Sequence, residues 1–317
     1  MIPKISVFIT SYNQKDFLSE AIESVINQTL RPFEVIIVDD CSSDGSQELI
    51  MNYAVRYPGL VRTYLHDKNL GIAKNKAFAQ KQVRGDWLTY LDGDDRFLPR
   101  KLEHEFQSLE KAPDARIAYS DYYVIDSVGN RLQRWAEGAT PPSGYIFPQV
   151  YGRSFHRRSL FRCELIAREC LDSVGFYDED RLTHEDWDFK IRLTRHFRTV
   201  YSPEPLTEYR THSGGISQRM PAASLLRQIL AVYQKNLGLL DGLPASEQHM
   251  IRTDLADFLE DRTNRMIQKS ADAGQILGSI KSLLEFHDLL SSSDIVRDIM
   301  YVAGRVPLSM KRRIKAG

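Results

Sequence analysis

The sequence has few cysteines, no net charge and no long hydrophobic run, and each absence excludes a class of protein. Lys+Arg and Asp+Glu each number 42 among the 317 residues, so the formal net charge is zero. This argues against a protein that wraps nucleic acid, because such domains are normally basic. The 3 cysteines form no CxxC pair and no His/Cys cluster, which argues against a disulfide framework or a structural zinc site. We therefore expect a reducing compartment and no nucleic-acid partner.

No apolar run in the sequence approaches the roughly 20 residues that a membrane-spanning helix needs. The chain enters a strand-like run at Met1–Ile5, and the polar segment Asn13–Asp16 follows soon after. We therefore expect no signal peptide. The sequence predicts a cytoplasmic protein whose membrane contact, if it has one, is peripheral and at the inner face.

The first part of the chain alternates short apolar runs with stretches of helical periodicity, which is typical of an α/β protein. The sequence predicts strands at 5–10, 33–38, 61–66 and 86–91, with helices at 17–28, 43–56, 72–81 and 99–109. Four strand–helix units imply a parallel sheet with right-handed crossovers. Further along we predict a strand at 117–126, a loop or lid at 127–150, mixed structure at 151–210, and helices at 225–239, 246–268, 274–290 and 295–302.

Acidic residues directly follow two of the predicted strands. Asp39 and Asp40 come after the second strand, and Asp92, Asp94 and Asp95 come after the fourth. Ligands of open parallel sheets bind outside the carboxyl ends of the strands. These carboxylates are therefore expected to line the ligand site.

The sequence contains neither GxGxxG after the first strand nor GxxxxGK[ST] anywhere, so no glycine loop is available to present amides to phosphates. Carboxylates facing a diphosphate repel it unless a cation intervenes, so these acids and a phosphorylated ligand together imply a divalent metal. Asp92 and Asp94 stand two apart in Leu91–Asp95 (LDGDD) and can project to one side of a turn. One would then meet a ribose hydroxyl and the other the metal; a solvated acidic turn is the alternative.

Two further segments leave alternatives open. The pair Asp39–Asp40 can contact a ribose or base, as acids after a second strand often do, or cap the following helix, and the two roles can fall on different residues of the pair. The segment Asn69–Lys76 opens the third predicted helix, where Lys74 and Lys76 can favour an anion. A solvated basic helix start explains Lys76 at least as well.

A third acidic cluster lies at His184–Asp188 (HEDWD), at the start of a predicted helix. Acids at a helix N-terminus are modestly stabilising, but three acids within four residues are more than capping needs. The spacing is not HExxH, so we reject a zincin. His212 ends the mixed region, and a lone histidine is more often structural or solvated than a ligand.

Taken in order, these segments resemble the family 2 glycosyltransferases, enzymes of the GT-A fold, over about residues 4–218. The segments that carry the resemblance are Ile5–Asn13 (ISVFITSYN), Val38–Ser42 (VDDCS), Gly71–Asn75 (GIAKN), Leu91–Asp95 (LDGDD), Gly175–Asp178 (GFYD) with Glu185–Asp188 (EDWD), and Tyr209–His212 (YRTH). The resemblance implies a Rossmann-like, mostly parallel sheet flanked by helices at 1–218. Its nucleotide-binding half would cover about 1–110 and its acceptor half about 111–218, followed by a helical extension at 219–317.

The resemblance also implies an activity: inverting transfer from a nucleotide-diphospho-sugar to an acceptor hydroxyl, with Mn²⁺ or Mg²⁺. The roles that it implies are base contact for Asp40, ribose contact for Asp92, backbone approach to the nucleotide for Thr10, phosphate contact for Lys74, metal ligation for Asp94 and His212, and general base for Asp186. Lys74 stands where the family commonly carries arginine. Lysine keeps the positive charge but cannot form the two parallel hydrogen bonds that an arginine side chain makes to a phosphate.

We expect a UDP-sugar donor, a glycan or lipid-linked acceptor, and a role in cell-surface polysaccharide or glycoconjugate synthesis. The absence of a QxxRW motif predicts a non-processive enzyme. Residues 219–317 have three open roles: packing on the catalytic domain, dimerisation, or shaping the acceptor site. The segment Val306–Lys315 either touches an anionic membrane or is solvated. The alternative functions are a sugar nucleotidyltransferase, which usually has a glycine-rich basic loop, and a non-catalytic nucleotide-sugar-binding module, against which Asp186 speaks.

Overall fold

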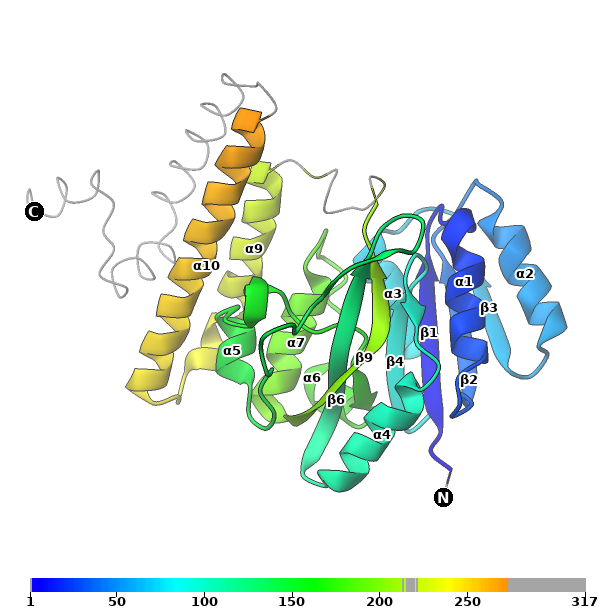
Figure 1. Cartoon of the computed structure of the whole chain (residues 1–317), viewed down its shortest axis with the longest axis horizontal. Helices are drawn as coiled ribbons and strands as arrows, with labels where there is room; N and C mark the ends of the chain where they lie inside the picture. Colours follow the sequence, from blue (N-terminus) through cyan, green and yellow to red (C-terminus); the bar gives the residue numbers. More distant parts are fainter. Residues whose placement is uncertain (1, 213, 215–219, 221, 273–317) are drawn as a thin grey trace, which may run out of the picture. The chain divides into compact units, whose positions relative to one another are not determined.

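The computed structural model describes residues 2–212, 214, 220 and 222–272 (Figure 1). The chain divides into two compact units, one of Met1–Ile146 with Phe161–Gly215 and one of Phe147–Leu160 with Ile216–Gly317. The division predicted near residue 218 stays a prediction. The helices predicted at 274–290 and 295–302, and the basic segment at 306–315, lie outside the described residues.

The first part of unit 1 alternates strands and helices as the sequence predicts. Its elements are β1 (Ile5–Ser11), α1 (Lys15–Ile26), β2 (Glu34–Asp39), α2 (Ser46–Arg56), β3 (Val61–Leu65), α3 (Ile72–Lys81) and β4 (Trp87–Asp92). The strands pair in parallel in the order β3-β2-β1-β4. Every residue of β1 and β2 is buried, as expected for parallel strands covered on both faces.

The remainder of unit 1 extends the same sheet with mixed pairing. Its elements are β5 (Arg96–Phe97), α4 (Lys101–Lys111), β6 (Ala115–Ile125), β7 (Arg131–Arg134), β8 (Leu165–Ala167), α6 (Cys170–Val174), α7 (Glu185–His196) and β9 (Arg198–Arg210). β8 is antiparallel to β4 and to β6, β6 is parallel to β9, and β5 is antiparallel to β9. The sheet order is therefore β3-β2-β1-β4-β8-β6-β9-β5, with β7 on β6.

The prediction of a loop or lid at 127–150 is wrong for two stretches. β7 (Arg131–Arg134) pairs with β6, and α5 (Phe147–Tyr151) begins inside the same range. β7 is largely exposed, so it has no alternation of apolar and polar residues. A strand held only by its pairing leaves no period-two signal in the sequence.

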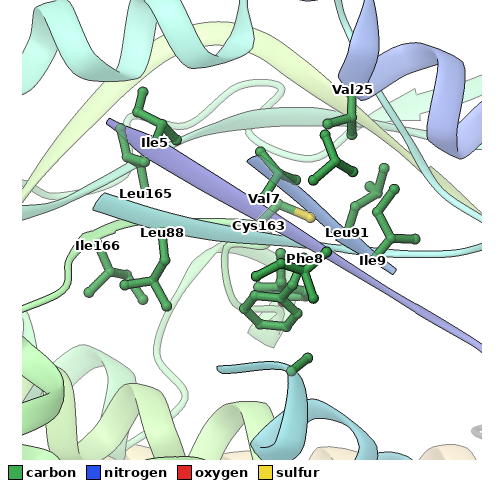
Figure 2. Close-up of a cluster of buried hydrophobic side chains, with 14 of the residues drawn as sticks. Ile5, Val7, Phe8, Ile9, Val25, Leu88, Leu91, Cys163, Leu165 and Ile166 are labelled. Atoms are coloured by element: carbon green, nitrogen blue, oxygen red, sulfur yellow. The ribbon is translucent and has the colours of Figure 1, made fainter. Parts of the chain in front are cut away.

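The core of unit 1 includes side chains of β1, β2, β4 and β8 and of the helices that cover them. Figure 2 shows Ile5, Val7, Phe8 and Ile9 of β1 among side chains of neighbouring elements. The neighbours labelled there are Val25, Leu88, Leu91, Cys163, Leu165 and Ile166. Burying each large aliphatic or aromatic side chain stabilises the fold by about 1.5–3 kcal/mol. This core fixes the strands whose ends carry the candidate site residues.

Unit 2 is helical in its described part. Its elements are α5, the 3-10 helix η1 (His156–Arg158), α9 (Ala222–Asn236), the 3-10 helix η2 (Leu237–Leu240) and α10 (Ala245–Asp272). The hydroxyls of Tyr151 and Tyr233 each donate to the other residue's carbonyl, at 3.3 and 3.2 Å. A Cβ at Gly152 would meet the Asp254 Cβ at 2.8 Å, so a side chain there would push α10 away. Among the described residues, no helix has both the length and the apolar character of a bilayer-crossing segment.

Candidate active site

The ends of β1, β2 and β4 meet at one edge of the sheet, as the sequence predicts. Thr10 lies opposite Val38 on one side and Asp92 on the other. Its hydroxyl donates to the Asp92 carboxylate at 3.3 Å, and its carbonyl accepts from the Gly93 amide at 2.9 Å. A Cβ at Gly93 would meet that same carbonyl at 3.1 Å. The glycine therefore allows the chain to turn tightly under Thr10.

Asp39 and Asp40 hold the loops around this edge. The Asp40 carboxylate accepts the backbone amides of Leu70 and Gly71 at 2.7 and 2.9 Å, on separate oxygens. Asp39 accepts the Ser42 amide at 2.8 Å. Neither residue caps α2, whose N-cap residue is Gly45. Both carboxylates are buried, and Asp40 fixes the entry into α3.

The turn after β4 is tied to the end of β9. The Asp94 Oδ2 and His212 Nε2 atoms lie 2.9 Å apart, although 118 residues separate them. The Arg210 side chain donates to the Asp94 carbonyl at 2.8 Å, and the Arg210 amide donates to the Asp95 carboxylate at 2.8 Å. Burial, reinforced by the charge of Asp94, raises the pKa of Asp95 well above its usual range. Asp95 thus anchors the turn, whereas Asp94 and His212 face each other as a carboxylate–imidazole pair.

This pair fits a metal that takes its other ligands from a substrate. Among the described residues, no group of three or more His, Cys, Asp or Glu side chains is arranged to hold a metal. Asp94 and His212 provide one oxygen and one nitrogen, each on a side chain that is 17% exposed. Mg²⁺ and similar ions at nucleotide sites commonly bind one or two protein side chains plus phosphate oxygens. Imidazole is a ligand that transition metals accept more readily than Mg²⁺ does, although Mn²⁺ shares the preference of Mg²⁺ for oxygen ligands.

Lys76 is buried between two acids, so the interpretation of it as a solvated helix start is wrong. It is 2% exposed. Its ammonium lies 3.0 Å from Asp92 Oδ1 and 3.2 Å from Glu185 Oε1. Burial by itself would lower the pKa of Lys76, but the neighbouring carboxylates, led by Asp92, outweigh it and raise the pKa. Lys76 therefore stays charged and joins the end of β4 to the start of α7. Lys74, two residues earlier, is exposed.

The three acids of α7 have three different environments. Glu185 is buried against Lys76. Asp188 is buried and accepts from Arg192 at 2.8 Å. Asp186 is 32% exposed, and its Oδ2 lies 3.6 Å from the Lys190 ammonium. Asp186 is thus the acid of this cluster that a substrate can reach.

The surrounding cations keep Asp186 ionised. Burial opposes ionisation, but Lys190, Lys76 and Arg162 together hold the pKa of Asp186 below its usual range. Lys190 is itself buried and lies 3.1 Å from Glu164 Oε1. An ionised, partly exposed carboxylate is the state that a proton acceptor requires.

The comparison with known proteins identifies the family. The model of Glycosyl transferase family 2 matches residues 6–170, more than half of the chain. The chain belongs to glycosyltransferase family 2. The predicted family and the predicted enzyme class are thereby confirmed.

Two relatives of this family 2 glycosyltransferase are themselves named as glycosyltransferases. The uncharacterized glycosyltransferase MJ1057 of Methanocaldococcus jannaschii is 29% identical over 211 residues, covering 66% of this chain and 71% of its own. The putative glycosyltransferase EpsE of Bacillus subtilis is 29% identical over 238 residues, covering 73% and 81%. Each match covers more than half of this chain and more than half of the relative.

Solved structures share the fold of this family 2 glycosyltransferase. S. aureus TarS 1–349 in complex with UDP-GlcNAc gives a TM-score of 0.58 at 16% identity, covering 90% of this chain and 92% of TarS 1–349. The mannosyltransferase PcManGT from Pyrobaculum calidifontis, in complex with GDP-Man and Mn²⁺, gives 0.57 at 16% identity, covering 96% and 85%. At such identity the likeness shows the fold alone. It confirms the predicted GT-A class with helices at the C-terminal end.

Sequence reasoning missed two residues that tie the site of this glycosyltransferase together. Arg210 links β9 to the Asp94–Asp95 turn, and nothing in its local sequence indicates that contact. Lys76 did carry a signal, because the buried residues of α3 include Ala73, Lys76, Ala77 and Gln80. Their spacing of i, i+3, i+4 and i+7 marks one helical face. A lysine on that face is expected to be paired rather than solvated.

Proposed function

We propose that this enzyme is a metal-dependent, inverting and non-processive glycosyltransferase that transfers a sugar from a nucleotide-diphospho-sugar to an acceptor hydroxyl. The observation that carries the proposal is the Asp94–His212 pair, 2.9 Å apart, which joins the turn that follows Asp92 to the end of β9. The nucleotide-sugar complexes of TarS and PcManGT support it, because both proteins share the fold of this chain. The mannosyltransferase complex contains Mn²⁺ as well.

The donor nucleotide is proposed to lie along the ends of β1, β2 and β4. In this proposal Asp92 contacts the ribose, Asp40 the base, and Thr10 the nucleotide through its backbone. Asp40 already accepts two backbone amides, but an ionised carboxylate has about four lone-pair sites and retains acceptors for a base N–H. Lys74 is exposed in the first turn of α3, where its charge is available to a phosphate. A UDP-sugar is the donor that we propose.

Asp94 and His212 are the residues that would hold Mn²⁺ or Mg²⁺. When bound, the ion would supply Lewis-acid stabilisation of the charge that gathers on the departing diphosphate. The turn that carries Asp94 is pinned by Arg210, so its position is fixed before any ligand arrives.

Asp186 is the proposed general base. A sugar hydroxyl is too weakly acidic to ionise first, so the carboxylate accepts its proton as the new C–O bond forms, an effect typically worth 10²–10⁴-fold in rate. The lowered pKa of Asp186 keeps it deprotonated and makes it a weak base. Proton transfer is therefore expected to accompany the attack, in an oxocarbenium-like transition state. Attack from the face opposite the diphosphate inverts the anomeric centre.

The wider setting is also a proposal. The acceptor would be a glycan or a lipid-linked glycan in cell-surface polysaccharide or glycoconjugate synthesis, and the enzyme would work in the cytoplasm or at the inner face of the membrane. Dimerisation through the C-terminal helices is a further proposal, which size-exclusion chromatography with light scattering tests directly.

Binding of nucleotide sugars tests the proposal and requires no acceptor. The thermal midpoint of the full chain is measured with UDP- and GDP-sugars, with and without Mn²⁺. A true donor raises the midpoint by mass action, and raises it further with the metal. Asp94→Asn should remove the metal-dependent part. Full transfer activity in the presence of a chelator would contradict the metal role, and retention of anomeric configuration in the product would contradict inversion.

A further inference from the structure

Arg162 is an arginine beside the candidate site to which the proposed mechanism gives no role. It precedes β8 by three residues, and its guanidinium carbon lies 3.6 Å from the centroid of the Tyr209 ring. Tyr209 stands on β9, close in sequence to His212. Tyr209 therefore holds the Arg162 guanidinium by one of its faces, on the strand that leads to His212.

The charge of Arg162 acts on both sides of the site. The charge of Arg162 interacts favourably with that of Asp95. Burial by itself would raise the pKa of Asp186. Three neighbouring cations lower it, Lys190 and Lys76 most and Arg162 next. Arg162 thus lies within electrostatic reach of the acidic turn after β4 and of the proposed base on α7.

The N–H groups of Arg162 are uncommitted in the described part of the chain. No hydrogen bond or ion pair joins its guanidinium to any residue that the structure describes. Arg131 provides the contrast, because its guanidinium stacks on Tyr123 at 4.1 Å but also donates to Glu208 at 2.7 Å. Arg162 is half-buried, and a guanidinium that is stacked and partly shielded from water but has no acceptor is available to an anion that reaches the site.

We propose that Arg162 is an anion-binding residue of the active site that receives a phosphate group of a substrate. The planar fork of arginine matches two phosphate oxygens, and stacking on Tyr209 leaves the edge of the guanidinium free to donate. The inference rests on the proposed function, in which the donor carries a diphosphate. The phosphate is either that of the donor or one carried by the acceptor, and the two sources share this chemistry.

Titration of inorganic phosphate tests the proposal on the full-length chain. Calorimetry compares the wild type with Arg162→Gln and Arg162→Lys, and with Arg131→Gln as the matched stacked arginine. We expect Arg162→Gln to weaken phosphate binding by about tenfold or more, because a charge-assisted bidentate contact is lost. Arg162→Lys should fall between, and Arg131→Gln should bind as the wild type does. Phosphate binding that is equal in the wild type and Arg162→Gln, or absent from the wild type, overturns the inference.

The same titration with UDP and Mg²⁺ already bound separates the two sources. If bound UDP removes the Arg162-dependent binding, Arg162 receives the donor diphosphate. If that binding persists, it receives a phosphate of the acceptor. The thermal midpoint of Arg162→Gln shows whether that variant folds. Arg162→Lys keeps the positive charge and removes only the paired N–H donors of the guanidinium, so it tests the bidentate contact even if Arg162→Gln folds poorly. Failure of the wild type to bind any nucleotide with metal would contradict the proposed function, whereas Arg162-independent phosphate binding contradicts this inference alone.

Discussion

Replacing Lys76 by methionine should destabilise the fold strongly, because it leaves two acids without their shared cation. The Lys76 side chain is 3% exposed and lies 3.0 Å from Asp92 and 3.2 Å from Glu185. Removing one partner of a buried ion pair typically costs about 3–5 kcal/mol. Water can still solvate Asp92, whose side chain is 21% exposed, so we expect about 3 kcal/mol. That is a large part of a domain stability of about 5–15 kcal/mol.

The deficit caused by Lys76→Met should depend on pH in a defined direction. Burial raises the pKa of Glu185, and Lys76 is the main charge that opposes this rise. Without Lys76 the folded-state pKa of Glu185 rises further above its unfolded value of about 4.3. The folded state then binds more protons than the unfolded state, so the free energy of unfolding falls as pH rises through that interval. The deficit should be smallest in acid and grow towards neutral pH.

Urea unfolding followed by tryptophan fluorescence measures this deficit at about pH 5 and about pH 8. Lys101→Met is the matched control, because Lys101 is also fully buried and is paired with Glu105. Both variants should lose stability. At equal fraction folded, Lys76→Met should also lose sugar transfer, because Lys76 fixes the start of the helix that carries the proposed base. An unfolding free energy for Lys76→Met within about 1 kcal/mol of the wild type, or a deficit that does not change with pH, would refute the reasoning.

Three other substitutions test separate parts of the site. Asp186→Asn should lower transfer by about 10²–10⁴-fold while calorimetric donor affinity is kept, and undiminished transfer would exclude Asp186 as the base. Asp94→Asn should abolish the extra thermal shift that Mn²⁺ gives to a bound nucleotide, and an unchanged metal increment would exclude Asp94 as a ligand. Asp40→Ala should cost about 1–3 kcal/mol per orphaned amide at Leu70 and Gly71, measured by urea unfolding, and a neutral result would mean that water replaces the carboxylate.

The parallel half of the fold could be predicted because its signals are local. β1 and β2 are runs of buried residues, and the helices between the strands carry an apolar stripe of period 3.6. The other half depends on distant pairings. β8 has only three residues and exists through its contacts with β4 and β6, far away along the chain. Such a strand has no pattern of its own, so the mixed pairing of that half was not predictable from periodicity.

The site divides in the same way. Parallel strands bring their carboxyl ends to one edge, so the sequence predicts that Thr10, Asp40 and Asp92 converge. The contact between Asp94 and His212 spans 118 residues. Spacing alone left His212 as a lone histidine, and only the family resemblance placed it at the metal. The roles of these residues stay predictions until ligands are measured.

The pairing of the buried lysines indicates why this site needs cations from elsewhere. Lys76 and Lys190 each lie between two carboxylates and on the Tyr90 ring, at 4.7 and 5.5 Å. Two ammonium groups facing four acids leave no positive charge to offer a diphosphate. That charge must come from groups without such acidic partners, and the candidates in the described part of the chain include the exposed Lys74 and the stacked Arg162, together with the metal proposed at Asp94. Glu185→Gln would remove one of the two acids that Lys76 faces and leave Asp92 as its acidic partner. This variant should accordingly bind nucleotide diphosphate with less dependence on metal, and unchanged dependence would contradict this account of the charges.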